Sequence, residues 1–189
     1  MPRVVDGDRR RAELTDAAAR VIARSGPEAA TMREVAREAG WTTGVLTHYF
    51  ADKRALLLAT YRASLADRQA ANAEPAANPI DEVRRSLMVA LPLDEDRRRH
   101  WLVTLACCTV AASDPELGTA QRDAYRLYRD HVAGAVAAAG LGGDPVAVAE
   151  RLITIVDGVA VQALFDPESW PPDRQLDTVE ALLPPPLRS

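Results

Sequence analysis

The chain has 189 residues, of which 48% are hydrophobic, 26% charged and 5% aromatic, with a formal net charge of −4. This length suits one large domain or two small ones, and the abundance of Ala, Leu, Arg and Glu favours an all-α protein. The polar start argues against a secretory signal, and the apolar run 101–112 is shorter than the ~20 residues of a membrane span, so we expect a cytoplasmic protein.

The N-terminal residues predict a tail and two helices. Residues 1–8 show no apolar period and are expected to form a mobile tail, whereas 9–25 carry apolar residues at helical spacing before a Gly-Pro stop. Thr31 opens a second helix, because its side chain can accept from the backbone near Glu34 while Glu34 reaches back to Thr31 in a capping box. Gly40 supplies the left-handed residue that ends this helix.

A third and a fourth helix follow. Thr42 or Thr43 is expected to cap the third, and Asp52 to cap the fourth. Residues 70–79 combine small side chains, Asn and two prolines, which indicates a linker between domains.

The two predicted domains, 1–68 and 69–189, differ in charge. The first holds 12 Arg or Lys against 9 Asp or Glu, and the second holds 11 against 18. A basic module joined to an acidic body is typical of a protein that binds a polyanion, although ordinary fluctuation would give the same split.

Five more helices are predicted beyond the linker, which makes about nine in all. They cover residues 80–91, 94–112, 114–139 and 144–164 and a short segment that follows Pro171-Pro172. The helix over 94–112 is apolar almost all round and is expected to be buried. Its adjacent cysteines, Cys107 and Cys108, indicate buried apolar residues and not a metal pair or a disulfide.

The main functional signal lies between Thr31 and Leu57. In a helix-turn-helix the second helix lies in the major groove of DNA, and small residues with a glycine at the turn let the helices pack closely. Ala36, Gly40 and Leu46 have this spacing, which predicts DNA binding, although a plain helical hairpin with a glycine turn would also have it.

The residue types of this region are more specific than their spacing. The informative segments are Ala39-Gly40, Thr42-Thr43-Gly44, Val45-Leu46, His48-Tyr49-Phe50 and Lys53 with Leu56-Leu57. Together they resemble the N-terminal domain of the tetracycline-repressor (TetR) family of regulators over residues 9 to about 65. Further segments resemble the C-terminal domain of BetI-type members: Trp101, Ser113-Asp114-Pro115-Glu116-Leu117, Val156-Asp157-Gly158-Val159 and Leu164-Phe165-Asp166-Pro167.

This resemblance implies an N-terminal helix-turn-helix domain and a C-terminal domain for effector binding and dimerisation. The implied function is a ligand-responsive DNA-binding regulator, by family habit a repressor that a small molecule releases from a palindromic double-stranded DNA operator. The DNA contacts carried over from the family are Arg33, Thr42, Thr43, Gly44, Thr47, His48, Tyr49 and Lys53.

These residues divide by chemistry. The threonine hydroxyls can reach bases or phosphates, whereas His48, Tyr49 and Arg33 would hold the DNA backbone. Lys53, the one lysine beside 22 arginines, adds its charge to a helix N-terminus and forms a phosphate site. The run Arg9–Arg11 is a further candidate for DNA contact.

Two positions depart from the family pattern. Members usually carry an aromatic residue where Thr47 stands and a branched aliphatic residue where Trp41 stands. Both departures affect the expected operator sequence and not the expectation of DNA binding.

The candidate effector residues are apolar and aromatic side chains of the C-terminal half: Met88, Leu91, Trp101, Leu105, Cys108, Tyr125, Tyr128 and His131. Tyr125, Tyr128 and His131 recur every third residue and form one stripe, which core packing would also explain. The BetI-type resemblance implies small cationic or metabolite effectors, since an aromatic cage can bind a quaternary amine.

Family members form homodimers through their last two long helices. Here that face would comprise Leu152, Ile155, Val159, Gln162 and Ala163 with Leu176, Val179 and Leu183, although internal core packing is the alternative.

An enzyme is not expected. His48, His100 and His131 fall on three separate helices, and no metalloprotease, nucleophile-elbow or phosphate-loop motif occurs, so neither a metal nor a cofactor is predicted. The main alternative is a helical interaction protein without DNA activity, in which Thr43 and Lys53 would be dispensable.

Overall fold

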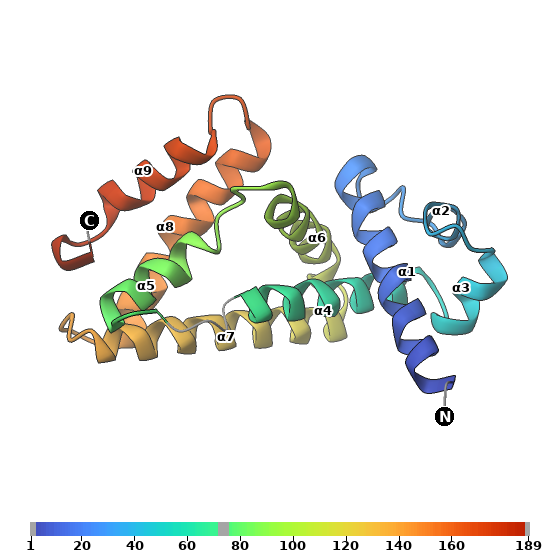
Figure 1. Cartoon of the computed structure of the whole chain (residues 1–189), viewed down its shortest axis with the longest axis horizontal. Helices are drawn as coiled ribbons and strands as arrows, with labels where there is room; N and C mark the ends of the chain where they lie inside the picture. Colours follow the sequence, from blue (N-terminus) through green and yellow to red (C-terminus); the bar gives the residue numbers. More distant parts are fainter. Residues whose placement is uncertain (1–2, 72–75, 188–189) are drawn as a thin grey trace. The chain divides into compact units, whose positions relative to one another are not determined.

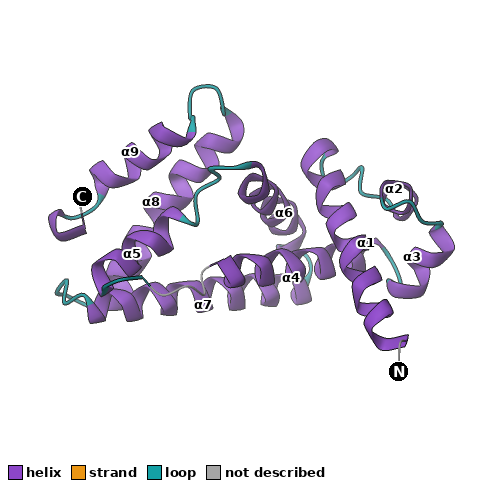
Figure 2. Ribbon diagram, in the orientation of Figure 1, coloured by secondary structure: helices purple, strands orange, loops and turns teal. Residues whose placement is uncertain are grey.

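The computed structural model describes residues 3–71 and 76–187, and every regular element in these ranges is helical (Figures 1 and 2). The elements are α1 (Arg3–Ser25), α2 (Met32–Glu38), α3 (Thr43–Tyr49), α4 (Lys53–Ala71), α5 (Pro79–Met88), α6 (Glu95–Ala111), α7 (Pro115–Ala138), α8 (Pro145–Phe165), α9 (Pro172–Leu182) and the 3-10 helix η1 (Pro185–Leu187). The predicted all-α fold is confirmed. None of the described helices has the length and hydropathy needed to cross a membrane.

The chain divides into two compact units. The first unit comprises Met1–Asp67 with Arg99–Gln121, and the second comprises Arg68–Arg98 with Arg122–Ser189. Three helices, α4, α6 and α7, therefore begin in one unit and end in the other. The domain boundary after residue 68 stays a prediction.

In the first unit α1 packs against α2, and α2 packs against α3. The buried apolar side chains include Leu14, Ala17, Ala18, Val21, Ile22, Val35, Ala36, Leu46, Phe50, Leu56 and Tyr61. Glu38 of α2 accepts hydrogen bonds from Arg20 Nε and Arg24 Nη2 of α1, each at 3.0 Å. The bond from Arg20, followed by that from Arg24, holds the pKa of Glu38 below its usual range, so the α1–α2 contact is both apolar and ionic.

The ends of two predicted elements differ from the sequence prediction. α1 begins at Arg3, so residues 3–8 are helical and not a tail, while residues 1–2 lie outside the described residues. Each residue added to a helix contributes one backbone hydrogen bond, whatever its side chain. A helix can therefore extend beyond its apolar positions, and the spacing of apolar residues does not show where it begins. Within the predicted linker 70–79, α4 extends to Ala71, residues 72–75 lie outside the described residues, and α5 begins at Pro79.

The capping box predicted for α2 is half formed. Thr31 Oγ1 accepts from Glu34 N at 3.2 Å, as predicted. The Glu34 carboxylate does not return to Thr31: it accepts from Arg37 Nη2 at 2.5 Å, and Thr31 N donates to Ala29 O at 2.8 Å. A cationic partner one turn along the helix binds a carboxylate more strongly than a backbone amide does.

Two predictions for the middle of the chain were wrong in detail. α5 ends at Met88 and not at Leu91. α6 is only partly buried: its buried residues are Trp101, Val103, Ala106 and Cys107, whereas Cys108 is exposed. Adjacent residues on a helix point about 100° apart, so only one of the two cysteines faces the interior. Burial raises the pKa of the Cys107 thiol to about 12.

The core of the second unit is formed mainly by α5, α7, α8 and α9, and α8 packs against both α5 and α9. Its members include Leu152, Val159, Val179 and Leu183, four residues of the predicted dimer face. Ala163, a fifth residue of that face, is also buried, at 2% exposure. Because they are buried within the chain, these five cannot form a surface. Ile155 and Leu176 pack partly against the same core, and Gln162 is exposed.

Arg98 closes the C-terminal end of α8. It donates from Nη1 to Ala163 O at 3.3 Å and from Nη2 to Leu164 O at 3.2 Å. Carbonyls in the last turn have no partner within the helix, and the helix dipole favours a cation beside them.

Arg98→Met is therefore expected to lower the free energy of unfolding by about 1–2 kcal/mol. Urea unfolding would measure this loss. Arg97→Met is the matched control, because the ion pair that Arg97 forms with Asp94, at 2.8 Å, spans one turn of the same helix and is partly solvated, so its loss should change stability little. Equal losses in the two variants would contradict a specific role for Arg98.

Candidate functional site

Gly40 and Thr42 set the turn between α2 and α3. Gly40 has a φ of +72°, a left-handed conformation that costs residues with a side chain about 1–2 kcal/mol. Thr42 has an extended backbone and its Oγ1 accepts from Val45 N at 3.4 Å, so Thr42 and not Thr43 caps α3. Of the seven residues of α3, only Leu46 is buried. The remainder of this short helix is available to a partner.

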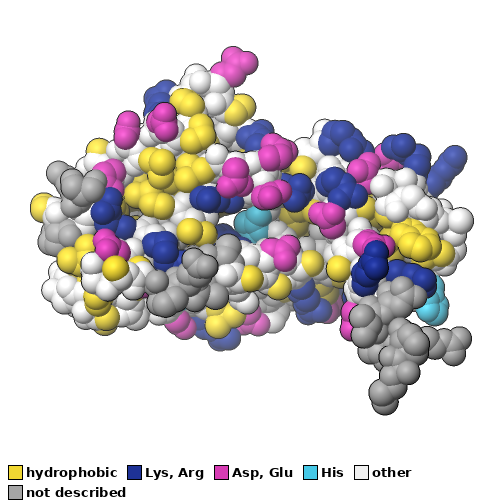
Figure 3. All heavy atoms as spheres, in the orientation of Figure 1, with side chains coloured by type: hydrophobic (Ala, Val, Ile, Leu, Met, Phe, Trp, Pro, Cys, Tyr) yellow, Lys and Arg dark blue, Asp and Glu magenta, His cyan; other side chains and the backbone are white. Residues whose placement is uncertain are grey.

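The residues predicted to contact DNA lie on α3 or close to its ends in sequence, except Arg33, which lies at the start of α2. Arg33, Thr42, Thr43, Gly44, Thr47 and His48 are exposed, and Tyr49 and Lys53 are half-buried. Thr47 Oγ1 donates to Gly44 O at 3.1 Å, and the rings of His48 and Tyr49 meet edge to face with centroids 5.3 Å apart. Lys and Arg side chains gather over α1 and α2 in the same unit (Figure 3).

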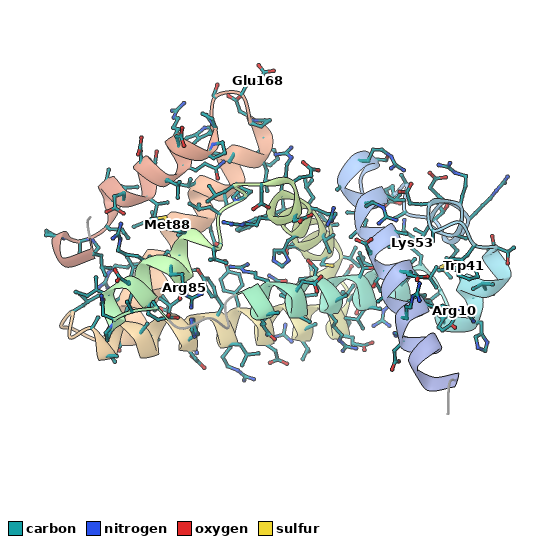
Figure 4. The ribbon with its side chains drawn as sticks, in the orientation of Figure 1. Arg10, Trp41, Lys53, Arg85, Met88 and Glu168 are labelled. Carbon is teal, nitrogen blue, oxygen red and sulfur yellow. The ribbon has the colours of Figure 1, made fainter. Side chains whose placement is uncertain are left out.

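Two arginines of α1 pack on aromatic rings of the helix-turn-helix. Arg10 Cζ lies 5.4 Å from the centroid of the Trp41 ring (Figure 4), and Arg11 Cζ lies 4.7 Å from that of Phe50. Arg11 Nη1 also donates to Tyr49 O at 3.3 Å. The sequence prediction considered these arginines only as DNA contacts and missed this packing. The available signal was Trp41, whose ring can accept a cation.

Lys53 has a partner within the chain. Its Nζ donates to Glu28 O and to Glu28 Oε2, each at 3.3 Å, and the Glu28 side chain is 99% exposed. Asp52 caps the same helix end by accepting from Ala55 N at 2.7 Å, as predicted. Since exposed ion pairs are weak, a phosphate can replace Glu28 at little cost.

Arg54 connects α4 to the start of α7. It donates through Nη2 to Asp114 Oδ1 at 2.8 Å and through Nε to the other oxygen of the same carboxylate. These bonds lower the pKa of Asp114 to about 2. Arg11, Arg54 and Arg62 also line an open groove of about 600 Å3 between α1 and α4. All three guanidinium groups are engaged by the protein itself, which makes the groove a poor anion site.

The predicted effector residues are divided between the units. Trp101, Leu105 and Cys108 belong to the first unit, and Met88, Leu91, Tyr125, Tyr128 and His131 belong to the second. Leu91 is a fully buried core residue, whereas the Tyr125 side chain is 45% exposed. The predicted stripe Tyr125, Tyr128 and His131 thus has no uniform environment.

A polar cluster surrounds Ser86 of α5. Tyr128 OH donates to Ser86 O at 3.1 Å. His131 Nε2 lies 2.9 Å from Ser86 Oγ and 3.1 Å from Glu82 Oε1. In a catalytic triad the serine and the acid face opposite nitrogens of the ring, whereas here both face the same one. The cluster therefore lacks the geometry of a nucleophilic site.

Asp157 of α8 is a half-buried acid that the sequence prediction omitted from its candidate residues. Burial raises the pKa of its carboxyl to about 6, against the opposing charge of Arg68. Arg68 Cζ also lies 4.8 Å from the centroid of the Tyr128 ring. The sequence contained a signal, because an acid in the apolar stretch 152–164 is unusual without a role.

At pH 7.5 Asp157→Asn is expected to stabilise the protein by about 2 kcal/mol, allowing for the partly solvated carboxylate. The folded-state pKa of about 6 lies above the ordinary 3.8, so wild-type stability from this group falls as pH rises from 3.8 through about 6. The amide introduced by Asp157→Asn resembles the protonated form of the Asp157 carboxyl. The difference in stability between Asp157→Asn and the wild type should therefore vanish near pH 4, where the wild-type carboxyl is protonated. Thermal unfolding at both pH values measures the difference.

Asp177→Asn, at an exposed position of α9, is the control and should have little effect at either pH. A gain for Asp157→Asn that is the same at pH 4 and pH 7.5 would rule out titration of this group as the cause.

Two protein-family models match the chain. Residues 14–60 match the family model described as "Bacterial regulatory proteins, tetR family", and residues 79–184 match that of the "BetI-type transcriptional repressor, C-terminal". The chain belongs to the TetR family. The predicted resemblance to this family and to its BetI-type subgroup is confirmed, and the protein is a DNA-binding transcriptional regulator and not an enzyme.

Two curated TetR-family relatives match along most of their length. The regulator is 31% identical over 165 residues to the HTH-type transcriptional regulator BetI of Rhizobium meliloti (strain 1021), covering 86% of this chain and 81% of that protein. It is 29% identical over 180 residues to the HTH-type transcriptional regulator PksA of Bacillus subtilis (strain 168), covering 92% and 88%.

Solved structures share the fold. A transcriptional regulator from Rhodococcus sp. Rha1 superposes with a TM-score of 0.81 at 29% identity, covering 88% of this chain and 90% of that chain. A regulator from Saccharomonospora viridis in complex with choline superposes with a TM-score of 0.84 at 23% identity, covering 92% and 95%.

Proposed function

We propose that this TetR-family regulator binds a palindromic operator as a homodimer in the cytoplasm, represses transcription there and is released by a small molecule. The observation that carries the proposal is α3. It is held by one buried residue, Leu46, and capped by Thr42, while Thr43, Gly44, Thr47 and His48 are exposed. A helix of this kind can enter the major groove while α2 lies across the backbone.

The proposed DNA contacts follow from side-chain chemistry. Thr42, Thr43 and Thr47 would meet base edges or phosphates at the groove, and exposed Gly44 lets the backbone approach closely. His48, Tyr49 and Arg33 would contact phosphate oxygens, which fix register without reading sequence. Lys53 would exchange Glu28 for a phosphate at the start of α4.

The dimer surface is proposed to lie on the exposed residues of α8 and α9. Gly158, Gln162 and Phe165 follow one side of α8, and Leu182 lies near the end of α9. Phe165 is 76% exposed and Leu182 is 55% exposed, which is unusual for large apolar side chains. A two-fold axis at this surface would bring each residue close to its copy on the second subunit.

The effector is proposed to bind the C-terminal half, where the candidate residues lie. Release from DNA requires that it bind the DNA-free state more tightly than the DNA-bound state. The Saccharomonospora viridis regulator is in complex with choline. At 23% identity that protein supports the fold alone.

Selection of random DNA fragments by the purified protein tests the function directly. The expected result is an enriched two-fold symmetric motif, with half-site centres about 34–36 Å apart on one face of the duplex. Absence of enrichment at low salt would reject operator binding by the ligand-free protein. The alternative, a helical interaction protein, predicts that outcome.

Two substitutions should separate phosphate contacts from base contacts. Lys53→Ala is expected to weaken binding to all DNA about tenfold and to reduce the salt slope by about two per dimer, because each subunit loses one phosphate contact. Thr43→Ala should instead change the preferred base at one symmetric pair of positions. Titration of operator and random DNA at several salt concentrations measures both effects.

Arg126→Ala, which removes a cation from the exposed side of α7, is the control for Lys53→Ala and should leave DNA binding unchanged. If Thr43→Ala weakened operator and random DNA equally, or if Lys53→Ala left the salt slope unchanged, the assigned roles would be incorrect.

A further inference from the structure

Two side chains of α4 bind the first part of α7 within the first unit. Arg54 donates to both oxygens of the Asp114 carboxylate, and Tyr61 OH donates to Gln121 Oε1. Arg54 and Tyr61 are seven residues apart, which places them on the same side of the helix two turns from each other. α4 is therefore joined to α7 at two points.

The Asp114 carboxylate is buried and has several partners at once. Its side chain is 10% exposed, and Oδ1 accepts from Glu116 N at 3.0 Å, from Leu117 N at 3.2 Å and from Arg54 Nη2 at 2.8 Å. A planar guanidinium that meets both oxygens of a carboxylate fixes the angle of the pair as well as its distance. Arg54 is thus held in one orientation on the backbone of the first turn of α7.

This pair lies close in sequence to the proposed DNA surface. α3 ends at Tyr49, and Arg54 follows five residues later as the second residue of α4, next to Lys53. α7 begins in the first unit and ends in the second. The Arg54–Asp114 pair therefore connects the helix-turn-helix to a helix that continues beyond the unit that carries it.

The orientation of α3 matters because an operator has a second property besides its base sequence. Each base pair added between two half-sites moves them about 3.4 Å apart along the duplex and rotates one against the other by about 34–36°. A dimer whose two recognition helices are rigidly oriented fits one spacing. A dimer whose recognition helices can turn fits several spacings, and gains less from the fit to each.

We propose that the Arg54–Asp114 ion pair is a positioning pair that determines which half-site spacing the regulator accepts, because it fixes the orientation of the helix-turn-helix on the start of α7. This inference rests on the proposed function, since it assigns the spacing specificity of the same dimer. Base contacts from α3 then select the half-site, and the ion pair selects the distance between the two half-sites.

Operators of altered spacing test the proposal. The motif enriched by the wild-type protein is rebuilt with one or two base pairs added or removed at its centre. We expect each such change to weaken binding of the wild type by about tenfold or more, and binding of Arg54→Met by less than about threefold. Arg54→Lys, which keeps the charge but not the two-point contact, should lie between them.

DNA with one half-site separates positioning from a structural role. Arg54→Met leaves α3 and its proposed contacts intact, so its affinity for a single half-site should equal that of the wild type. Arg62→Met is the matched control on the same helix, because Arg62 Nη2 lies 3.6 Å from Glu116 Oε1 and its side chain is 60% exposed. This control should keep the wild-type dependence on spacing.

An Arg54→Met protein with the wild-type dependence on spacing would overturn the proposal, as would loss of single half-site binding in that variant. If Arg54→Met does not fold, Asp114→Asn removes the charge and keeps an oxygen to cap α7, and it should relax the spacing in the same way. A wild type that binds a two-fold motif equally well at every spacing would overturn the role of the pair alone. A wild type that enriches no motif would overturn the proposed function.

Discussion

Phe165→Glu is expected to convert the homodimer into monomers and to weaken operator binding by about 100-fold or more. Phe165 ends α8 with 76% of its side chain exposed. An aromatic side chain at the centre of an interface commonly contributes more than about 2 kcal/mol, and two-fold symmetry places two copies in each dimer. The introduced glutamates would also repel each other across the axis.

The loss of operator affinity follows from geometry. A dimer holds both half-sites at once, so the second contact forms at a high effective concentration that a monomer does not have. Analytical ultracentrifugation gives the oligomeric state, and a titration with operator DNA gives the affinity.

Leu127→Glu is the matched control, because Leu127 is also a large exposed apolar residue, at 57%, but lies on α7. This variant should stay dimeric. A dimeric Phe165→Glu protein, or dissociation of both variants, would reject the proposed surface.

Leu46→Ala should destabilise the first unit by about 2–5 kcal/mol and abolish specific DNA binding. Leu46 is fully buried and is the only buried residue among the seven of α3. A helix this short has little stability by itself and depends on its packing. Truncation of its one buried side chain should therefore destabilise α3 more than a similar truncation would destabilise a long helix.

Urea unfolding gives the loss in stability, and amide hydrogen exchange of residues 43–49 tests whether the helix itself opens. Leu127→Ala provides the same chemical change at an exposed site and should alter stability by less than about 0.5 kcal/mol. If α3 kept its exchange protection in Leu46→Ala, other contacts would have to hold it.

The features that the sequence predicted correctly are local. Asp52 accepts a backbone hydrogen bond from Ala55 N, as predicted, and Asp94 and Asp144 each accept one in the same way from a residue two or three positions later. Such caps depend on neighbours in the chain and not on the fold. The helix-turn-helix was predictable for the same reason, since Gly40 and Thr42 act within a few residues of one another.

The contacts that the sequence did not predict join distant residues. Arg98 meets carbonyls 65 and 66 positions away, and Arg68 meets a ring 60 positions further along the chain. The residues next to an arginine in the sequence do not indicate which distant group it will contact. Its partner can therefore be identified only in the folded structure. The dimer face was misplaced for a related reason: the apolar side of α8 was correctly recognised, but the core of the same subunit covers most of it.

The stacking of Arg10 on Trp41 and of Arg11 on Phe50 bears on how the specificity of this regulator can diverge. These arginines contact the residues on either side of α3, so under the proposed function the angle at which α3 meets a base pair would depend on side chains of α1. A mutation at Arg10 or Arg11 can re-aim α3 and alter the operator without changing any residue that reads a base. Paralogues with identical recognition helices can in this way acquire separate target genes.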